Sequence, residues 1–131
     1  MEKILVDPLR VGDVVCLNLN PVQGDEKNKI RPCLVIQKRI TPLDLITVLP
    51  ITDDNGKREG LFFVKIPDSK KSGLTKKSVV DCYQIRTVSK TRVIKKVGSL
   101  SAELVDEAKK AVALILGIHS YHITTSQTEE N

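Results

Sequence analysis

The sequence predicts a mainly β domain: a small, strongly curved antiparallel barrel with one amphipathic helix at its C-terminal end. Short apolar runs alternate with turn residues up to residue 98, which is typical of strands. Val, Ile and Leu must fill the core, because aromatic residues make up only 3% of the chain and Trp is absent. Val and Ile, the β-branched members of this set, favour strands. Closely spaced strands followed by a single helical segment favour a barrel against which that helix packs.

Each strand is expected where an apolar run is bounded by turn residues. Turn and loop compositions occupy Thr41–Asp44, Asp53–Gly56 and Asp68–Gly73. The six strands expected from this punctuation are Asp13–Leu19, Arg31–Lys38, Leu45–Ile51, Leu61–Ile66, Ser78–Val88 and Lys95–Gly98.

The helix is expected from Ser101 to Leu116. Ser101 can cap its first turn, Glu103 suits that turn electrostatically, and Gly117 can end it. Its apolar residues recur at helical spacing and define the face expected to pack on the sheet. These residues are Leu104, Val105, Ala108, Val112, Ile115 and Leu116.

The chain of 131 residues fits one domain, expected over residues 1–118, with a flexible polar tail over 119–131. Lys and Arg number 21 against 16 Asp and Glu, a formal charge of +5. A moderately basic domain suggests an acidic partner, with nucleic acid first and an acidic protein segment second.

The three cysteines indicate the compartment. Cys16, Cys33 and Cys82 lie inside expected strands and lack CxxC spacing, which argues against zinc and favours reduced thiols in the cytoplasm. No secretory signal and no apolar run long enough to span a bilayer is seen, so no membrane association is expected. No metal or other cofactor is predicted.

A polar loop between the first two expected strands, at residues 20–32, is the most informative stretch. Gly24 and its polar neighbours favour a loop, which brings Glu26 and Arg31 to the mouth of the β structure. Pro32 stiffens the backbone after Arg31, whose guanidinium is well placed there to bind a phosphate.

A series of short motifs, in order and at consistent spacing, resembles the MazF/PemK/Kid family of type II toxins over roughly residues 10–118. Each motif alone is weak, and the order carries the resemblance. The motifs are Gly12–Val15, Gly24-x-Glu26, Arg31-Pro32 with Leu34–Gln37, Pro50–Thr52, Ser78–Val80, Gln84–Lys90, Arg92, Val97-Gly98-x-Leu100-Ser101 and Leu116-Gly117.

The resemblance implies an SH3-like barrel of the CcdB/Kid/PemK type and a homodimer. It implies an endoribonuclease that cuts single-stranded RNA, often mRNA, a cognate antitoxin, and DNA binding by the toxin–antitoxin complex. The family's catalytic pair falls on Arg31 and Thr52. The RNA contacts expected from the motifs and the adjoining loops are Gly24, Asp25, Asp53, Ser78, Gln84 and Arg86.

These residue types suit metal-free cleavage, because RNA carries its own nucleophile in the 2′-hydroxyl. Arg31 can stabilise the phosphorane charge, and the hydroxyl of Thr52 can bond a nonbridging oxygen. Glu26 is the carboxylate of the loop that can accept the 2′-hydroxyl proton, either as the base or only to orient it.

Two departures from the family pattern and two alternatives stay open. One departure is Asp53, which follows Thr52 where relatives often have Ser. Relatives often carry an acidic residue just before the motif glutamine, where this chain has Tyr83. A gyrase poison of a cousin family relies on a Trp, which this chain lacks, and a non-catalytic RNA-binding barrel fits poorly with so few aromatic residues. His119 and His122 suggest a two-histidine ribonuclease, but they lie in the tail, past the helix.

Overall fold

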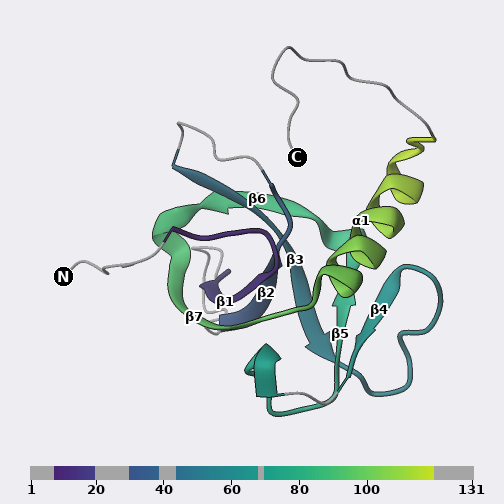
Figure 1. Ribbon diagram of the computed structural model, residues 1–131, viewed down its shortest axis with the longest axis horizontal. Coiled ribbons are helices and arrows are strands. Elements are labelled where there is room, and N and C mark those ends of the chain that lie inside the picture. Colours follow the sequence, from purple (N-terminus) through teal and green to yellow (C-terminus); the bar gives the residue numbers. More distant parts are fainter. Residues whose placement is uncertain (1–7, 20–29, 39–43, 68–69, 120–131) are drawn as a thin grey trace, which may run out of the picture.

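The computed structural model describes residues 8–19, 30–38, 44–67 and 70–119. A curved, wholly antiparallel sheet is followed by one C-terminal helix, α1 (Ala102–Leu116), which packs beside β4 (Figure 1). This confirms the expected mainly β class. The strands are β1 (Asp13–Asn18), β2 (Ile30–Val35), β3 (Leu45–Asp53), β4 (Phe63–Ile66), β5 (Ser78–Asp81), β6 (Arg86–Ser89) and β7 (Val93–Ser99), and the 3₁₀ turns are η1 (Lys70–Ser72), η2 (Cys82–Gln84) and η3 (Lys90–Arg92).

The sheet follows the strand order β4-β5-β3-β2-β1-β7, with β6 pairing to β3 off this path. Among the described strands it does not close into a full barrel, since β6 pairs with β3 and β7 pairs with β1 without meeting each other. The predicted small, strongly curved antiparallel barrel is confirmed as a barrel-like sheet that stays open among the described strands.

β3 is shared between two parts of the sheet. Its first four residues pair with β6, where Val48 is opposite Arg86, and its middle residues, Val48–Pro50, pair with β2 on the other side. Its last three residues pair instead with β5, where Ile51 is opposite Val80. The chain between β5 and β6 forms η2, which lies against β3 at this change of partner.

Two apolar clusters fill the domain, one on each side of the central strands. The first joins inward residues of β1–β5 to α1 and includes Leu34, Leu49, Ile51 and Ala108. The second lies on the opposite face and consists of Val15, Leu17, Leu19, Cys33, Val35, Ile46, Val48, Val88 and Val93. Because successive strand residues point to opposite faces, strands buried on both sides read as nearly continuous apolar runs.

The largest departure from the expected strands is at Ser78–Val88, which forms two strands separated by η2. Asp81 ends β5 and caps this turn, its carboxylate accepting the N–H of Tyr83 at 3.1 Å. Shorter differences occur at the ends: β2 stops at Val35, β3 continues to Asp53, β4 starts at Phe63 and β7 starts at Val93. The expected flexible tail at 120–131 lies outside the described residues.

α1 has the expected caps. The hydroxyl of Ser101 accepts the N–H of Leu104 at 3.2 Å, and Gly117 ends the helix with a φ of 75° that favours glycine. Val105, Ala108, Ala111 and Val112 are buried against the sheet, whereas Leu116, expected on that face, is 58% exposed. Ile115 still packs against the first apolar cluster, so only the end of the helix, at Leu116, extends past it.

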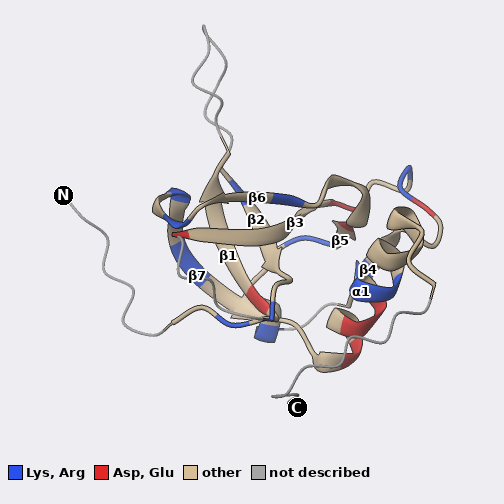
Figure 2. Ribbon diagram, turned by 90° about the horizontal axis from the view of Figure 1, so that it is seen from above, with Lys and Arg blue, Asp and Glu red and all other residues tan. Residues whose placement is uncertain are grey.

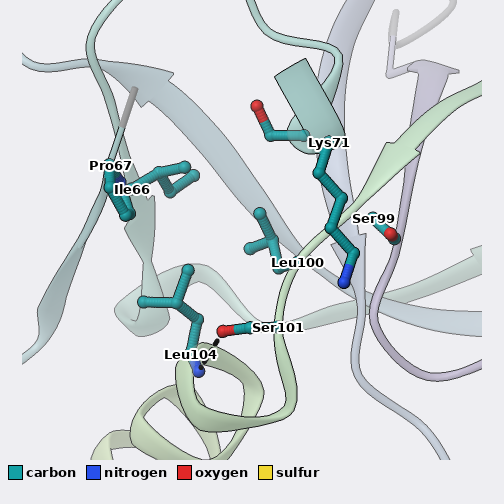
Figure 3. A pocket seen from close by; sticks show the side chains of 8 residues that line it. Ile66, Pro67, Lys71, Ser99, Leu100, Ser101 and Leu104 are labelled. Atoms are coloured by element: carbon teal, nitrogen blue, oxygen red, sulfur yellow. Dashed lines mark hydrogen bonds between the residues drawn. The ribbon is translucent and has the colours of Figure 1, made fainter. Parts of the chain in front are cut away.

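Gly98 lies where β7 passes η1. A side chain there would collide with the carbonyl oxygens of Lys71 and Ser72, so this close approach of two backbones needs glycine. The same region borders a pocket of about 110 Å³ between the end of β4, η1 and the start of α1 (Figure 3).

Replacing this glycine should destabilise the fold. Gly98→Ala is expected to lower the free energy of unfolding by roughly 1–3 kcal/mol, the usual cost of overpacking, whereas Lys95→Ala on the exposed side of β7 should change it little. Urea unfolding followed by circular dichroism measures both. Equal stability of the two variants would contradict the close packing of η1 on β7.

Candidate active site

The two residues expected to form the catalytic pair lie at the same end of the β2–β3 pair. Cys33 is opposite Pro50; Arg31 lies two residues before Cys33, and Thr52 lies two residues after Pro50. Strand alternation therefore places both on the face that Cys33 occupies. Arg31 is exposed and Thr52 is half-buried, as expected of groups at the rim of a core.

A second guanidinium belongs to the same rim. Cys33 is fully buried, and burial raises the pKa of its thiol to about 12, while the positive charges of Arg86 and, more weakly, Arg31 act in the opposite direction. Both arginines are therefore within electrostatic reach of this one thiol. Neither forms an ion pair with another residue in the described part of the chain, so the rim carries two cations suited to a phosphate.

Gln84 is held at the end of η2 by a buried carboxylate. Its amide Nε2 donates to Oδ2 of Asp81 at 2.7 Å, and Asp81 is only 5% exposed. Because η2 lies against β3 between its contacts with β5 and β6, this amide is on the opposite flank of β3 from Arg31.

Tyr83, a residue at which this chain departs from the family pattern, packs on aromatic neighbours. Its ring centroid lies 5.0 Å from that of Phe62 and 5.8 Å from that of Phe63. The N–H of Cys82 also donates to the carbonyl of Phe62 at 3.0 Å. Together these contacts hold η2 against β4, while the ring of Tyr83 remains 55% exposed.

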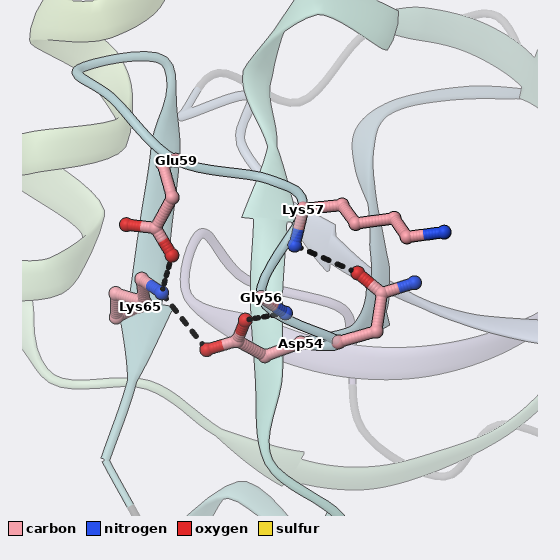
Figure 4. A network of polar contacts seen from close by, with 6 residues as sticks. Asp54, Gly56, Lys57, Glu59 and Lys65 are labelled. Atoms are coloured by element: carbon pink, nitrogen blue, oxygen red, sulfur yellow. Dashed lines mark hydrogen bonds and ion pairs between the residues drawn. The ribbon is translucent and has the colours of Figure 1, made fainter.

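The segment after Thr52 is fixed by a charged network (Figure 4). Nζ of Lys65 lies 3.0 Å from the Asp54 carboxylate and 2.8 Å from that of Glu59, and the N–H of Gly56 donates to Asp54 at 3.2 Å. The hydrogen bond from Lys65 lowers the pKa of Asp54, and Glu59 and Asp54 raise the pKa of Lys65. The loop beside Thr52 is thus charged and ordered.

The remaining expected RNA contacts differ in accessibility. Asp53 is exposed, and its carboxylate lies 3.7 Å from Nζ of Lys76. Ser78 is only 6% exposed and donates its hydroxyl to the carbonyl of Lys76 at 2.9 Å, which argues against a direct RNA contact. Gly24, Asp25 and Glu26 lie outside the described residues, so their position relative to Arg31 stays a prediction.

Charged residues are spread over several elements, and two pockets of the molecule lie away from the expected site. Lys and Arg colour parts of β6 and β7, while α1 carries both signs (Figure 2). The pocket of Figure 3 and a groove between β4 and α1, lined by Leu61 and Phe63 among others, contain none of the expected site residues. The exposed Arg31 and Arg86 and the half-buried Thr52 leave the rim of the sheet accessible to a ligand.

The remaining features to report are the histidines, clusters of metal ligands and membrane-spanning helices. The two-histidine interpretation is set aside on the sequence; His119 is exposed beyond the end of α1, and His122 lies outside the described residues. Within the described ranges, no three His, Cys, Asp or Glu side chains gather as metal ligands. No helix there has the length and apolar character needed to cross a membrane.

The family of PemK-like, MazF-like toxins of type II toxin–antitoxin systems has a sequence model that matches residues 10–116. The chain belongs to this family. Endoribonuclease MazF of Staphylococcus saprophyticus is 36% identical over 116 residues, which cover 86% of this chain and 94% of that protein. Endoribonuclease EndoA of Bacillus subtilis is 34% identical over 111 residues, 82% of this chain and 93% of that protein.

Solved structures of the family share the fold. The MazE–MazF structure (Form-II) from Deinococcus radiodurans matches with a TM-score of 0.67 at 22% identity, covering 85% of this chain and 97% of that one. Toxin MazF-mt6 of Mycobacterium tuberculosis matches with a TM-score of 0.66 at 23% identity, covering 82% and 99%.

Sequence reasoning found Arg31, Thr52, Gln84 and Arg86, which the fold places around one stretch of β3, but it missed Asp81. That residue sits in an apolar run and was expected to continue a strand. A signal was present, because Asp readily accepts the N–H two residues later and so favours a turn over a continuing strand.

Proposed function

We propose that this chain is the toxin of a type II toxin–antitoxin system and cleaves single-stranded RNA at the rim of β3 without a metal. The observation that carries the proposal is the family match over residues 10–116 together with the gathering of Arg31, Thr52, Gln84 and Arg86 around one strand. The relatives named endoribonucleases align over more than nine-tenths of their own length, which supports transfer of the activity.

The two arginines supply the electrostatic part of the reaction. In-line attack of the 2′-hydroxyl on the adjacent phosphorus breaks the bond to the 5′-oxygen and leaves a 2′,3′-cyclic phosphate and a 5′-hydroxyl. Charge builds on the nonbridging oxygens in the transition state, and a guanidinium presents several donors to them at once. Arg31 has the leading role, and Arg86 adds a second cation on the same rim.

Thr52 and Glu26 have smaller parts. The hydroxyl of Thr52 can donate to a nonbridging oxygen, but it is not a base unaided. Glu26 belongs to the loop before Arg31 and is the candidate to accept the 2′-hydroxyl proton. A guanidinium does not release a proton at neutral pH, so Arg31 stabilises charge and does not act as the base.

Cleavage should proceed in the presence of a chelator. RNA supplies the nucleophile and the arginines supply the charge stabilisation, so EDTA is expected to leave the rate unchanged. The products should carry a 2′,3′-cyclic phosphate, or the 3′-phosphate formed by its hydrolysis, and a 5′-hydroxyl, as read by mass spectrometry. A single deoxyribose at the cut site should stop cleavage. Activity that disappears with EDTA and returns with magnesium would disprove the mechanism.

Removing either member of the catalytic pair should slow cleavage by on the order of 10²-fold, the loss typical of one charge-stabilising donor. Arg31→Ala and Thr52→Ala are compared with Arg10→Ala and Thr75→Ala, which remove the same chemical groups from exposed positions outside the rim. Melting temperatures should stay close to that of the parent protein. Full activity of folded Arg31→Ala would remove Arg31 from the site.

The antitoxin is proposed to bind over this rim. Solved MazE–MazF complexes exist for a relative of the same fold, and the basic charge of this chain suits an acidic segment that folds on binding. The proposed assembly is a homodimer with two such RNA sites.

RNA and antitoxin should therefore compete. Labelled RNA is held on the cleavage-deficient Thr52→Ala protein while the acidic C-terminal segment of the antitoxin is added, and fluorescence anisotropy should fall to the value of free RNA. A ternary complex that retains the RNA would place the inhibitor at another surface.

A further inference from the structure

The hydrogen bond between Asp81 and Gln84 determines which end of the Gln84 amide faces outward. Asp81 uses both carboxylate oxygens within the turn, accepting the N–H of Tyr83 at 3.1 Å with Oδ1 and Nε2 of Gln84 at 2.7 Å with Oδ2. A carboxylate offers acceptors only. The reverse orientation of the amide would bring two oxygens together at this separation. Asp81 therefore holds the NH₂ group and turns the carbonyl Oε1 away.

That carbonyl is available to a ligand. Gln84 is exposed, and its Oε1 has no hydrogen-bond partner among the described residues. The turn behind it is rigidly supported, because Tyr83 packs on Phe62 and Phe63 and the N–H of Cys82 bonds the carbonyl of Phe62. An acceptor held on a supported turn is preorganised for a donor.

We infer that Asp81 is a positioning residue that fixes Gln84 as a hydrogen-bond acceptor for a donor group of the RNA, either a ribose 2′-hydroxyl or the exocyclic amine of a base. This inference rests on the proposed function and extends it by dividing the tasks at the rim. Phosphate oxygens offer acceptors only, so they suit Arg31 and Arg86. Gln84, with its carbonyl outward, suits the groups of RNA that donate.

The primary variant is Asp81→Asn, which preserves shape but can turn its own amide to donate to Oε1 of Gln84 and so reverse the Gln84 amide. Its kcat/KM for RNA is expected to fall about tenfold or more, the scale of leaving one bound hydrogen-bonding group unsatisfied. The loss should disappear in a Gln84→Ala background, because the two residues act as one unit. Asp106→Asn, an exposed carboxylate on α1, is the matched control. Equal losses in both backgrounds would overturn the inference.

RNA analogues that each lack one donor group identify the donor. Affinities for a short RNA cut by the parent protein are measured on the Thr52→Ala protein, with and without Asp81→Asn as a second substitution. If the donor is the ribose 2′-hydroxyl, a deoxyribose at the cut site should remove the loss of affinity that Asp81→Asn causes. If it is a base amine, the loss should disappear with the nucleoside that lacks that amine: inosine for guanosine, purine riboside for adenosine, or 2-pyrimidinone riboside for cytidine. If the loss of affinity caused by Asp81→Asn persists with every analogue, Asp81 does not position Gln84 as a hydrogen-bond acceptor for RNA.

A second variant, Gln84→Glu, tests the same contact in case the Asp81→Asn protein does not fold. Gln84→Glu changes an exposed side chain and places two carboxylates in hydrogen-bond contact, so the pair must share a proton. The kcat/KM of Gln84→Glu should fall as pH rises, over a range where the parent protein is unchanged. Parallel pH profiles would show that Asp81 does not act on residue 84. Failure of the proposed function is separate and appears as no cleavage by the parent protein.

Discussion

The change of pairing partner along β3 is the constraint on which the site depends. Val48 faces β6, Pro50 faces β2, and Ile51 faces β5, all within four residues of one strand. Pro50 lies at this change of partner and has no N–H, so it leaves no backbone donor unpaired where the ladder is interrupted. This change of partner brings residues 31, 52, 84 and 86, which are far apart in the sequence, around one strand.

The two apolar clusters give that convergence its rigidity. Central strands buried on both faces cannot shift register without exposing their apolar residues, so the rim side chains start from fixed backbone positions. Cys33, fully buried beside Arg31 and Arg86, keeps its thiol protonated and offers no competing nucleophile. The contacts of Lys65 with Asp54 and Glu59 hold the loop that follows Thr52.

Much of this arrangement could be predicted from the sequence, since apolar runs, turn residues and helix caps act locally. The caps of α1 at Ser101 and Gly117 are examples. The split of Ser78–Val88 could not be predicted from apolar patterning, because Asp81 looks like an interruption of a strand until its carboxylate is seen to cap η2. Leu116 fits the helical period but extends past the sheet, a fact of tertiary packing.

The site was predictable to a similar degree. Arg31 and Thr52 follow from motif order, whereas their placement on one face depends on the register of β2 and β3. Ser78 matched a motif but is buried, and Asp81 matched none yet holds Gln84. Burial and long-range hydrogen bonds are set by the whole fold, so local patterns carry little information about them.

The most direct test of the central claim is a crystal structure of the Thr52→Ala protein with a short RNA that carries one deoxyribose at its mapped cut site. The scissile phosphate should lie within hydrogen-bond distance of the Arg31 guanidinium, with Arg86 and Gln84 contacting the same nucleotide or its neighbour. An RNA bound on another face, with Arg31 exposed to solvent, would contradict the proposed site.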